Sequence, residues 1–412
     1  MFIRLACKSL LNRRGSVVMT VLALTVSIVV LSAVEHVRQQ ARHSFGNTVS
    51  GVDLIVGART GSLNLLLYSV FRVGSPTNNI SWAAYQHIAS GKQVAWAVPI
   101  ALGDSYQGYR VMGTTADYFT HFSYGGKRKL KFASGKAFAG VLDVVLGSEV
   151  ARKLHHKLGD QVVLAHGIAS TSFSLHDDKP FKVAGILAPT GTPVDQTVHV
   201  SLQGIEAIHI DWQQGVKIPG KAVTTEQLAD MDLQPTSITA FMLGLSSKMA
   251  TFRVQREINH YSGEPLMAIL PGVALSELWQ MMATFEHTLR LISACVLVSA
   301  LLGLSAMLLA SIREREREIH LLRVIGAPPM FLFLLIELEA LLISLVSIAL
   351  GTLLLYLVLR TGGDYLASEL GLHISANIWS ESNLYIALMV ILATMVAAAI
   401  PSLKAYRNAR FK

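Results

Sequence analysis

Histidine is the residue type of this sequence best suited to chemistry, because an imidazole ligates metals and exchanges protons near neutral pH. Four of the fourteen histidines lie close together in the chain, namely His155, His156, His166 and His176. The zinc-protease pattern His-Glu-x-x-His does not occur, and both cysteines, Cys7 and Cys295, lie in or beside apolar segments. Neighbouring residues of a helix point about 100° apart, which separates His155 from His156. We therefore expect surface histidines, with no metal site and no catalytic residue in the chain.

Two carboxylates, Glu337 and Glu339, interrupt a long apolar run. Carboxylates inside a membrane are costly and are candidates for function. Being two residues apart, they cannot share one face of a helix. We expect them to hold this segment against a neighbour rather than to relay protons.

A segment with the spacing of a phosphate-binding loop runs from Gly215 to Lys221. The loop requires a hydroxyl directly after its lysine to bind magnesium, and Ala222 stands there. We interpret the match as chance. The chain is then not an enzyme and holds no cofactor, and any nucleotide is bound by another chain.

The composition indicates a membrane protein. Of 412 residues, 52% are hydrophobic and only 15% are charged, whereas soluble domains carry about 25% charged residues. Four apolar runs are long enough to span a bilayer, at 15–34, 291–312, 330–359 and 384–400. The first run exceeds the length of a signal peptide, which favours an uncleaved anchor.

Basic residues near the ends of the spans predict the orientation. They concentrate in segments 1–14, 313–329 and 401–412, which places both termini in the cytoplasm and residues 35–290 outside. The net charge of +8 follows from this topology and does not indicate nucleic-acid binding.

Residues 35–290 predict a large domain of mixed structure. Val144–Leu146, Gln161–Ala165 and Phe181–Leu187 favour strands, and Gly147–Leu158 favours a helix. The unusually apolar stretch Gly51–Trp82 fits either a membrane-proximal loop or buried core. The expected fold is therefore a membrane α-helical protein with four transmembrane helices and a large α+β extracytoplasmic domain inserted between helices 1 and 2.

Both connections of this domain to the membrane have helical periodicity. Apolar residues recur on one face after the first span and again before the second, at Val34, Val37, Ala41 and Phe45, and at Leu275, Leu278, Met282, Phe285 and Leu289. The second set has the spacing of a two-helix seam. These segments predict a paired stalk that continues spans 1 and 2, or alternatively amphipathic helices packed on the domain.

The stretch 313–327 alternates charges and then turns apolar, and Pro328 and Pro329 end it. As a helix it places Ile319, Leu322 and Ile325 on one face. Such a helix at the inner face of a membrane suits docking on a soluble partner, although a loop that only sets topology has a similar charge.

Residues 317–327 resemble the coupling-helix motif of MacB/FtsX-like ABC permeases. Further matches are Glu339-Ala340-Leu341, Leu350-Gly351 and Pro401 with Lys404-Ala405, and the segments 144–160 and 181–187 are similar to the family's extracytoplasmic core domain. The resemblance implies that the ATPase docks on Arg317, Glu318, Ile319, Leu322, Arg323, Ile325 and Gly326.

The resemblance also implies the partners. Two permease copies, or one copy and a paralogue, would work with two cytoplasmic ATPase subunits that carry ATP and magnesium, in the inner membrane of a bacterial cell. ATP hydrolysis would move the periplasmic domain by mechanotransmission, to export or extract a lipoprotein, lipid, peptide or drug-like substrate. The alternatives are an FtsX-like regulator of a periplasmic partner that moves no substrate, and metal-linked transport.

The expected division of the chain follows from these assignments. It consists of the cytoplasmic N-terminus and first span (1–34), the stalk helices and periplasmic core domain (35–290), the second span (291–312), the coupling helix (313–329), the third span (330–359), a periplasmic loop (360–383), the fourth span (384–400) and a cytoplasmic tail (401–412).

Overall fold

The computed structural model describes residues 2–167, 176–210, 212–213, 216–217, 227, 231–314, 328–370 and 381–411. The chain forms two compact units. The helical unit consists of residues 1–41, 282–367 and 374–412, and the α+β unit of residues 42–281 and 368–373.

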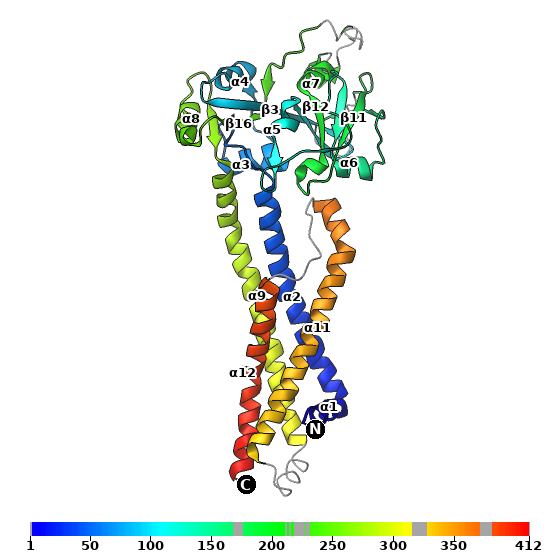
Figure 1. Ribbon diagram of the computed structural model, residues 1–412, viewed down its shortest axis with the longest axis vertical. Helices are drawn as coiled ribbons and strands as arrows, with labels where there is room; N and C mark the ends of the chain where they lie inside the picture. The colour runs from blue at the N-terminus through cyan, green and yellow to red at the C-terminus, as the bar shows by residue number, and fades with distance from the viewer. Residues whose placement is uncertain are drawn as a thin grey trace. The chain divides into compact units, whose positions relative to one another are not determined.

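The helical unit is built from long helices (Figure 1). A short helix, α1 (Phe2–Asn12), precedes α2 (Arg14–Asn47), α9 (Pro271–Glu314), α11 (Pro329–Leu370) and α12 (Glu381–Phe411). Over the described residues, four helices are long and apolar enough to cross a membrane, in the ranges Arg14–Arg42, Pro271–Glu314, Pro329–Gly362 and Glu381–Arg407. The large mixed domain lies between the first and second of them in the chain, which confirms the fold class expected from the sequence.

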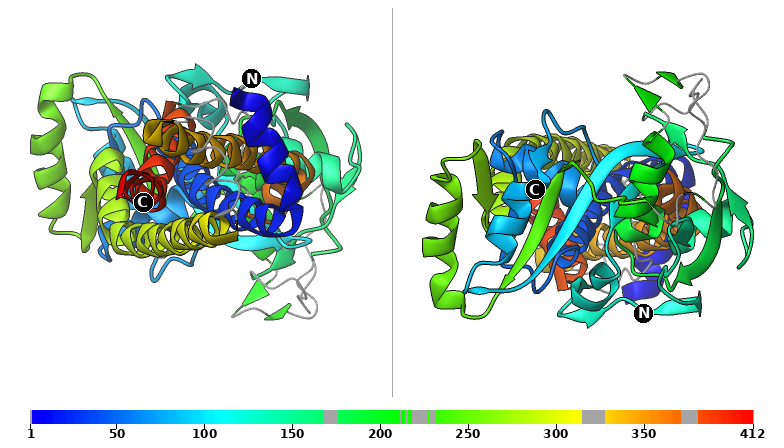
Figure 2. Two further views of the ribbon diagram at one scale, coloured as in Figure 1. Left: turned by 90° about the horizontal axis from the view of Figure 1, so that it is seen from below. Right: turned by 90° about the horizontal axis from the view of Figure 1, so that it is seen from above.

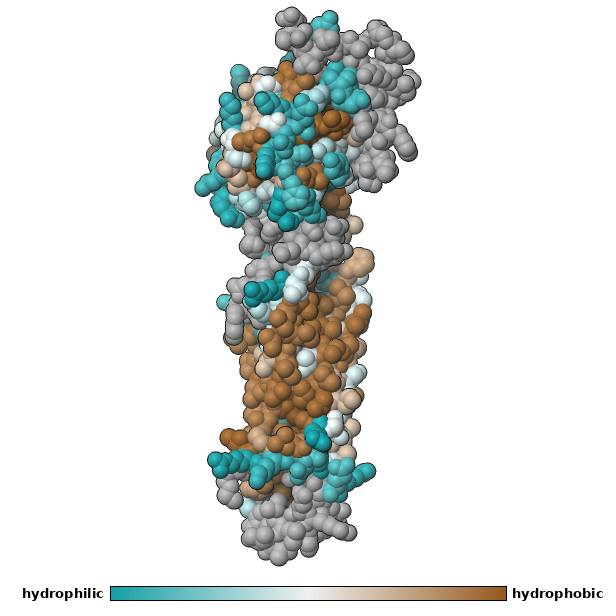
Figure 3. Space-filling view, turned by 90° about the vertical axis from the view of Figure 1, so that its right-hand side faces the viewer, coloured by the Kyte–Doolittle hydropathy of each residue, from teal (hydrophilic) through white to brown (hydrophobic). Residues whose placement is uncertain are grey.

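Small and branched apolar side chains fill the interior of the helical unit. Leu24 of α2, Leu304 of α9, Ala340 of α11 and Ala398 of α12 are all fully buried in one cluster. The outward faces are apolar as well, and Figure 3 shows them as a continuous brown band that ends in hydrophilic residues. An apolar exterior is unfavourable in water and suits contact with lipid.

Close helix packing depends on one glycine in particular. A Cβ at Gly351 of α11 would lie 3.0 Å from Cγ2 of Ile28 on α2. Small residues at such positions let helix backbones approach each other in a membrane. The left-hand view of Figure 2 shows the helices of this unit nearly end-on.

The α+β unit is organised around one large sheet. The strand order is β17-β1-β16-β3-β4-β12-β8-β11-β7, and the short strands β10 and β9 pair with β3 and β11. The strands are β1 (Leu54–Ala58), β3 (Val94–Tyr106), β4 (Tyr109–Thr114), β7 (Phe132–Gly135), β8 (Asp143–Leu146), β9 (Gln161–Val162), β10 (Ala165–His166), β11 (Phe181–Leu187), β12 (Thr197–Ser201), β16 (Ala240–Leu245) and β17 (Leu266–Ile269).

Strand β3 is thirteen residues long and belongs to both halves of this sheet. Its first part pairs with β16, and its last part pairs with β4 and β10. The right-hand view of Figure 2 shows it as the long curved arrow in light blue. The pairs β12–β4 and β11–β8 are parallel, and the other pairs within the sheet are antiparallel.

Helices pack on the sheet at both halves. They are α3 (Ser62–Leu66), a π-helical turn (Leu67–Phe71), α4 (Trp82–Ala89), α5 (Asp117–His121), α6 (Ser148–Lys153), α7 (Leu202–His209) and α8 (Thr251–Asn259). The small strands β2 (Ile80–Ser81) with β15 (Ser237–Ile238), β5 (Ser123–Tyr124) with β6 (Arg128–Lys129), and β13 (Trp212–Gln213) with β14 (Val216–Lys217) form separate pairs.

The apolar stretch after Gly51 forms core. Leu65, Tyr68 and Phe71 are buried in the largest apolar cluster of this unit. Gly57 on β1 lets these helices approach the sheet, because a Cβ there would lie 2.7 Å from Cδ1 of Leu65. Of the two interpretations of this stretch, the structure supports buried core.

Three elements predicted from the sequence have other bounds in the structure. The helix expected over Gly147–Leu158 is α6, which ends at Lys153 because His155 adopts a left-handed backbone with φ 56°. The strand expected over 161–165 is two strands, since the chain changes partner from β11 to β3. The loop expected from 360 to 383 begins later, because the backbone of α11 stays helical through Leu370 beyond the apolar run.

Both segments predicted to form the stalk are helical. The apolar residues of α9 that were predicted to face the other helix do not all do so. Helices α2 and α9 continue without a break through the predicted segments. Phe45 packs on Trp279 with ring centroids 5.8 Å apart, but Met282, Phe285 and Leu289 are exposed in the single chain. The spacing located an apolar face that α2 does not cover.

The buried imidazole of His199 on β12 makes the stability of the α+β unit dependent on pH. Burial, together with the positive charge of Arg72, lowers the pKa of His199 to about 3. The unfolded chain binds a proton near pH 6.5 and the folded chain does not, so stability is complete above pH 6.5 and falls as the pH drops toward 3. We expect His199 to cost about 2 kcal/mol of stability at pH 5.

The measurement is the unfolding midpoint of the full chain in detergent at pH 7 and pH 5, in the wild type and in His199→Asn. Asparagine keeps a donor for the carbonyl of Val145, which lies 3.3 Å from Nδ1 of His199. An equal loss of midpoint in both proteins would contradict the assignment.

Candidate functional site

At one end of the helical unit, the N-terminal segment binds two of the long helices. The hydroxyl of Ser9 donates a hydrogen bond to the buried carboxylate of Glu339 on α11. Arg13 donates from Nη2 to the carbonyl of Ser311 at 2.7 Å and lies 3.5 Å from the carboxylate of Glu314, both on α9. A guanidinium at the carboxyl end of a helix pairs with free carbonyls and with the negative end of the helix dipole.

The other intramembrane carboxylate faces a different helix. Glu337 is buried near Ser402 of α12, and its carboxylate oxygens make no hydrogen bond within the described part of the chain. Of the two glutamates, Glu339 is the one that joins α11 to another helix by a hydrogen bond within the described residues. Whether either has a role beyond packing stays a prediction.

Farther along α2, charged side chains join three helices. Glu35 of α2 accepts from Arg38 on the same helix and lies 3.4 Å from Nη2 of Arg290 on α9. Arg38 lies 3.8 Å from the carboxylate of Glu286 on α9. Gln39 donates to Glu35 at 3.0 Å and also contacts Ser382 at the start of α12. This network holds α2, α9 and α12 together with Glu35 and Arg38 mostly buried.

The residues predicted to dock an ATPase lie between α9 and α11. The structure describes α9 up to Glu314 and resumes at Pro328, so Arg317, Glu318, Ile319, Leu322, Arg323, Ile325 and Gly326 lie outside the described residues. Their helix and its docking role remain predictions.

In the α+β unit, two of the four candidate histidines come together with two residues that the sequence had not singled out. His166 and His176 lie with Asp104 and His209, and the ligand atoms of all four residues lie within 4.8 Å of one another. Asp104 is near the end of β3, His166 is its register partner on β10, and His209 ends α7.

The other two candidates lie elsewhere. His155 is exposed, and His156 contacts the hydroxyl of Tyr106 at 2.9 Å and the carboxylate of Asp160 at 3.3 Å. The prediction of ordinary surface histidines therefore fits His155 and does not fit the group around Asp104.

Electrostatics in this group is dominated by Asp104. Burial alone would raise the pKa of Asp104, but the neighbouring imidazoles of His166 and His209 outweigh it and hold the pKa at about 2. Burial lowers the pKa of His176 to about 4, and the charge of His209 adds to the effect. For His209, burial would lower the pKa, yet the bond to Asp104 raises it overall.

The signal that could have found Asp104 and His209 is weak. Asp104 is a single charged residue near the end of a long apolar strand, and His209 closes an amphipathic helix far from it in the chain. Only the antiparallel register of β10 on β3 and the placement of α7 bring them to one point.

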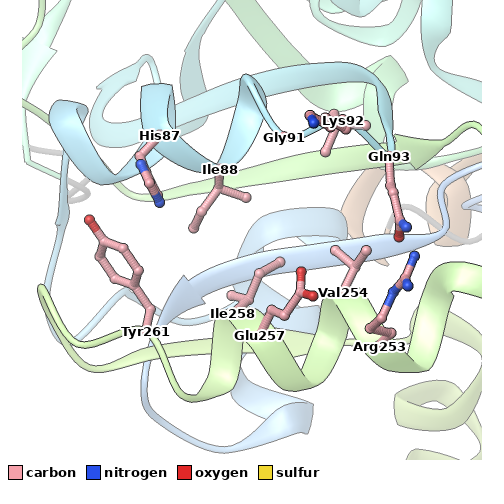
Figure 4. Close-up of a pocket in the computed structure, with 11 residues that line it drawn as sticks. His87, Ile88, Gly91, Lys92, Gln93, Arg253, Val254, Glu257, Ile258 and Tyr261 are labelled. Carbon is pink, nitrogen blue, oxygen red and sulfur yellow. The ribbon is translucent and has the colours of Figure 1, made fainter.

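A separate pocket lies between α4 and α8 (Figure 4). It has a volume of about 380 Å³, and its charged lining residues are Lys92, Arg253 and Glu257, which Figure 4 shows beside His87 and Tyr261. Its charges are of mixed sign, and no nucleophile paired with a base occurs among its lining residues.

Comparisons with known proteins agree with this architecture. Residues 16–259 match the MacB-like periplasmic core domain family, and residues 290–409 match the FtsX-like permease C-terminal family. No curated protein shows a significant match to the chain.

Two solved structures show similarity to part of the chain. The periplasmic region of MacB from Actinobacillus actinomycetemcomitans is 10% identical, with a TM-score of 0.34 over 56% of this chain and 94% of that one. The extracellular domain of the noncanonic ABC-type transporter YknZ from Gram-positive bacteria is 12% identical, with a TM-score of 0.32 over 53% of this chain and 98% of that one.

Four apolar helices with a large α+β domain inserted after the first define a multi-pass membrane protein with one inserted domain. Since the two family matches cover both parts of that arrangement, the chain belongs to the MacB/FtsX-like ABC permeases. It is the permease subunit of an ABC transporter, whose ATPase activity lies in a separate cytoplasmic subunit.

The contact between Ser9 and Glu339 is open to a direct test. In Ser9→Ala the buried carboxylate loses one donor, which should destabilise the protein by about 1–3 kcal/mol. The measurement is the thermal unfolding midpoint of the purified full chain in detergent. Ser299→Ala is the matched control, because the Ser299 hydroxyl is exposed and bonds only to the carbonyl of Cys295 on its own helix. Equal midpoints for the two variants would contradict a stabilising role for Ser9.

Proposed function

We propose that this permease subunit couples ATP hydrolysis on a separate cytoplasmic ATPase to movement of the α+β unit. The observation that carries the proposal is that α2 and α9 are each one unbroken helix, from their apolar segments into the α+β unit. A continuous helix transmits rotation and tilt along its axis because its backbone hydrogen bonds follow one another without a break. The mechanism is mechanotransmission rather than passage through a central pore.

The contacts between α2 and α9 support this mechanism. Within the helical unit, Arg290 and Glu286 of α9 face Glu35 and Arg38 of α2. Within the α+β unit, Trp279 of α9 packs on Phe45 and lies under the guanidinium of Arg42, 5.5 Å from the ring centroid. The two helices are paired in both units, so a displacement of one is passed to the other.

The input would come from the coupling helix. Arg317, Glu318 and Arg323 would bind the ATPase surface by charge, and Ile319, Leu322 and Ile325 would enter its apolar groove, with Gly326 ending the helix. ATP and magnesium would be held by the partner ATPase. Ser9 of α1 bonds to α11, and Arg13, between α1 and α2, bonds to α9. These are the two helices that flank this segment in the chain.

The assembly would contain two permease chains and two ATPases, since one chain carries one coupling helix. The exposed apolar face of α9 is consistent with a second permease chain. Met282, Phe285 and Leu289 are 41%, 66% and 48% exposed, and they lie next to the charged residues Glu286 and Arg290. Contact with another copy or a paralogue would cover them.

The same basic segments that flank the helices favour a bacterial inner membrane location with both termini in the cytoplasm. The α+β unit would then lie in the periplasm. There it could extract or export a lipoprotein, lipid, peptide or drug-like substrate, and it could contact a periplasmic partner.

Docking is tested by the double variant Ile319→Asp with Leu322→Asp. Two carboxylates on the apolar face should abolish recruitment of the ATPase, because each would be buried without a partner. The measurement is the ATPase to permease ratio after affinity purification from gently solubilised membranes. Phe252→Asp is the control, since Phe252 is 72% exposed on α8. An undiminished ratio in the double variant would rule out docking at these residues.

Mechanotransmission predicts a distance change between the two units during the ATP cycle. Spin labels are attached at Phe252→Cys on α8 and Leu384→Cys on α12, which are both exposed. The native cysteines Cys7 and Cys295 are first replaced by serine. The distance between the two labels then reports the change. We expect different distance distributions in the nucleotide-free and vanadate-trapped complexes. Arg38→Gln should reduce the difference while the ATPase stays bound. Identical distributions in both states of the wild type would contradict the mechanism.

A further inference from the structure

We propose that Asp104, His166, His176 and His209 form a zinc-binding site in the α+β unit. Three imidazoles and one carboxylate are a ligand set that suits a four-coordinate zinc ion. Their ligand atoms converge from three places in the fold, with a largest separation of 4.8 Å. This site is independent of the ATP coupling proposed above.

The distances among three of the four donor residues fit the edges of a zinc tetrahedron. Donors at about 2.0–2.1 Å from zinc are about 3.3–3.4 Å from each other. Oδ1 of Asp104 lies 3.3 Å from Nδ1 of His166 and 3.4 Å from Nε2 of His209. The two ring nitrogens are themselves 3.0 Å apart. Three donor atoms thus form one nearly equilateral face, at the size that zinc requires.

The orientation of His209 is fixed by the chain itself. Its Nδ1 lies 2.9 Å from the carbonyl of Ile205, one turn earlier on α7. A backbone carbonyl at Nδ1 selects the proton on that nitrogen and leaves the lone pair of Nε2 for a metal. It is Nε2 that faces Asp104 and His166.

The segment that carries His176 is held in place on both sides. The backbone N–H of His176 donates to the carbonyl of Leu164 at 2.9 Å, next to β10. Lys179, which is almost fully buried, donates from Nζ to the carbonyl of Ala207 on α7, also at 2.9 Å. His176 is therefore positioned before any ion arrives, which lowers the cost of ordering the site.

Two of the four ligand residues are buried, and the other two are partly exposed to solvent. Asp104 and His176 are inaccessible, whereas the side chains of His166 and His209 are 42% and 28% exposed. A buried aspartate beside three imidazoles supplies the negative charge that a divalent cation needs, and the exposed pair provides its path from solvent.

A hydrogen-bonded histidine–aspartate network without metal is the competing interpretation. It accounts for the contacts of Asp104 with His166 and His209. It does not account for the approach of a third imidazole, His176, whose ring centroid lies 5.1 Å from that of His209. A cation between the rings would draw the nitrogen lone pairs of all three imidazoles toward one point.

The test is zinc titration of the full-length permease, stripped with EDTA and reconstituted in lipid nanodiscs. Calorimetry with zinc chloride should show one ion per chain, and X-ray absorption should show nitrogen and oxygen donors at about 2.0–2.1 Å. Zinc should also raise the unfolding midpoint, since it binds only the folded arrangement.

The variants are His166→Asn, His209→Gln and Asp104→Asn. Each should weaken zinc binding at least about 100-fold, because loss of even a residue behind the ligands costs 10–100-fold. His166→Asn is the variant least able to disturb folding, since its side chain is partly exposed on a short edge strand. His155→Asn is the matched control, because His155 is exposed, lies outside the cluster and has a left-handed backbone that asparagine tolerates.

Zinc bound by the wild type and by His155→Asn, and lost in the three cluster variants, is the expected result. No stoichiometric zinc in the wild type would overturn the proposal. So would cluster variants that bind as tightly as the wild type, or loss of zinc in His155→Asn alone.

Discussion

Hydrocarbon offers no partner to a backbone N–H or C=O group, and this constraint determines the rest of the structure. A single segment that crosses the hydrocarbon satisfies its backbone as a helix, and the four candidate spans are helices in the described residues. Such a helix can continue beyond the membrane surface where the sequence carries no capping residue or proline that ends it. Helices α2 and α9 continue to Asn47 and back to Pro271, and they link the two units of the protein through their own backbones.

Polar side chains then decide how these helices pair. An ion pair or hydrogen bond among partly buried groups costs desolvation, so it specifies one register more than it adds stability. Glu35 with Arg290, and Ser9 with Glu339, select which faces of α2, α9, α11 and α1 meet. Apolar packing around Leu24 and Ala340 supplies the contact area between the same helices.

Periodicity and composition were sufficient for the architecture. Apolar runs of 17 to 30 residues predicted the spans, and the strand over Phe181–Leu187 was located to the residue. The prediction of which α9 residues contact α2 was wrong, because a helical period identifies an apolar face but not the element that covers it. Glu286 and Trp279 face α2, while Phe285 and Leu289 are exposed. The group around Asp104 was also missed, because its members meet only through the pairing of β10 with β3 and the position of α7. No spacing in the chain contains that information.

Strand β3 has a consequence for the mechanical behaviour of the α+β unit. Because it is hydrogen-bonded to β16 in its first part and to β4 in its last, neither half of the sheet can be pulled away without shearing a ladder along one common strand. Shear along a strand loads many hydrogen bonds at once, whereas peeling breaks them one at a time. A domain joined in this way resists stretching as a single body, because neither half of its sheet can deform without loading the strand that both halves share.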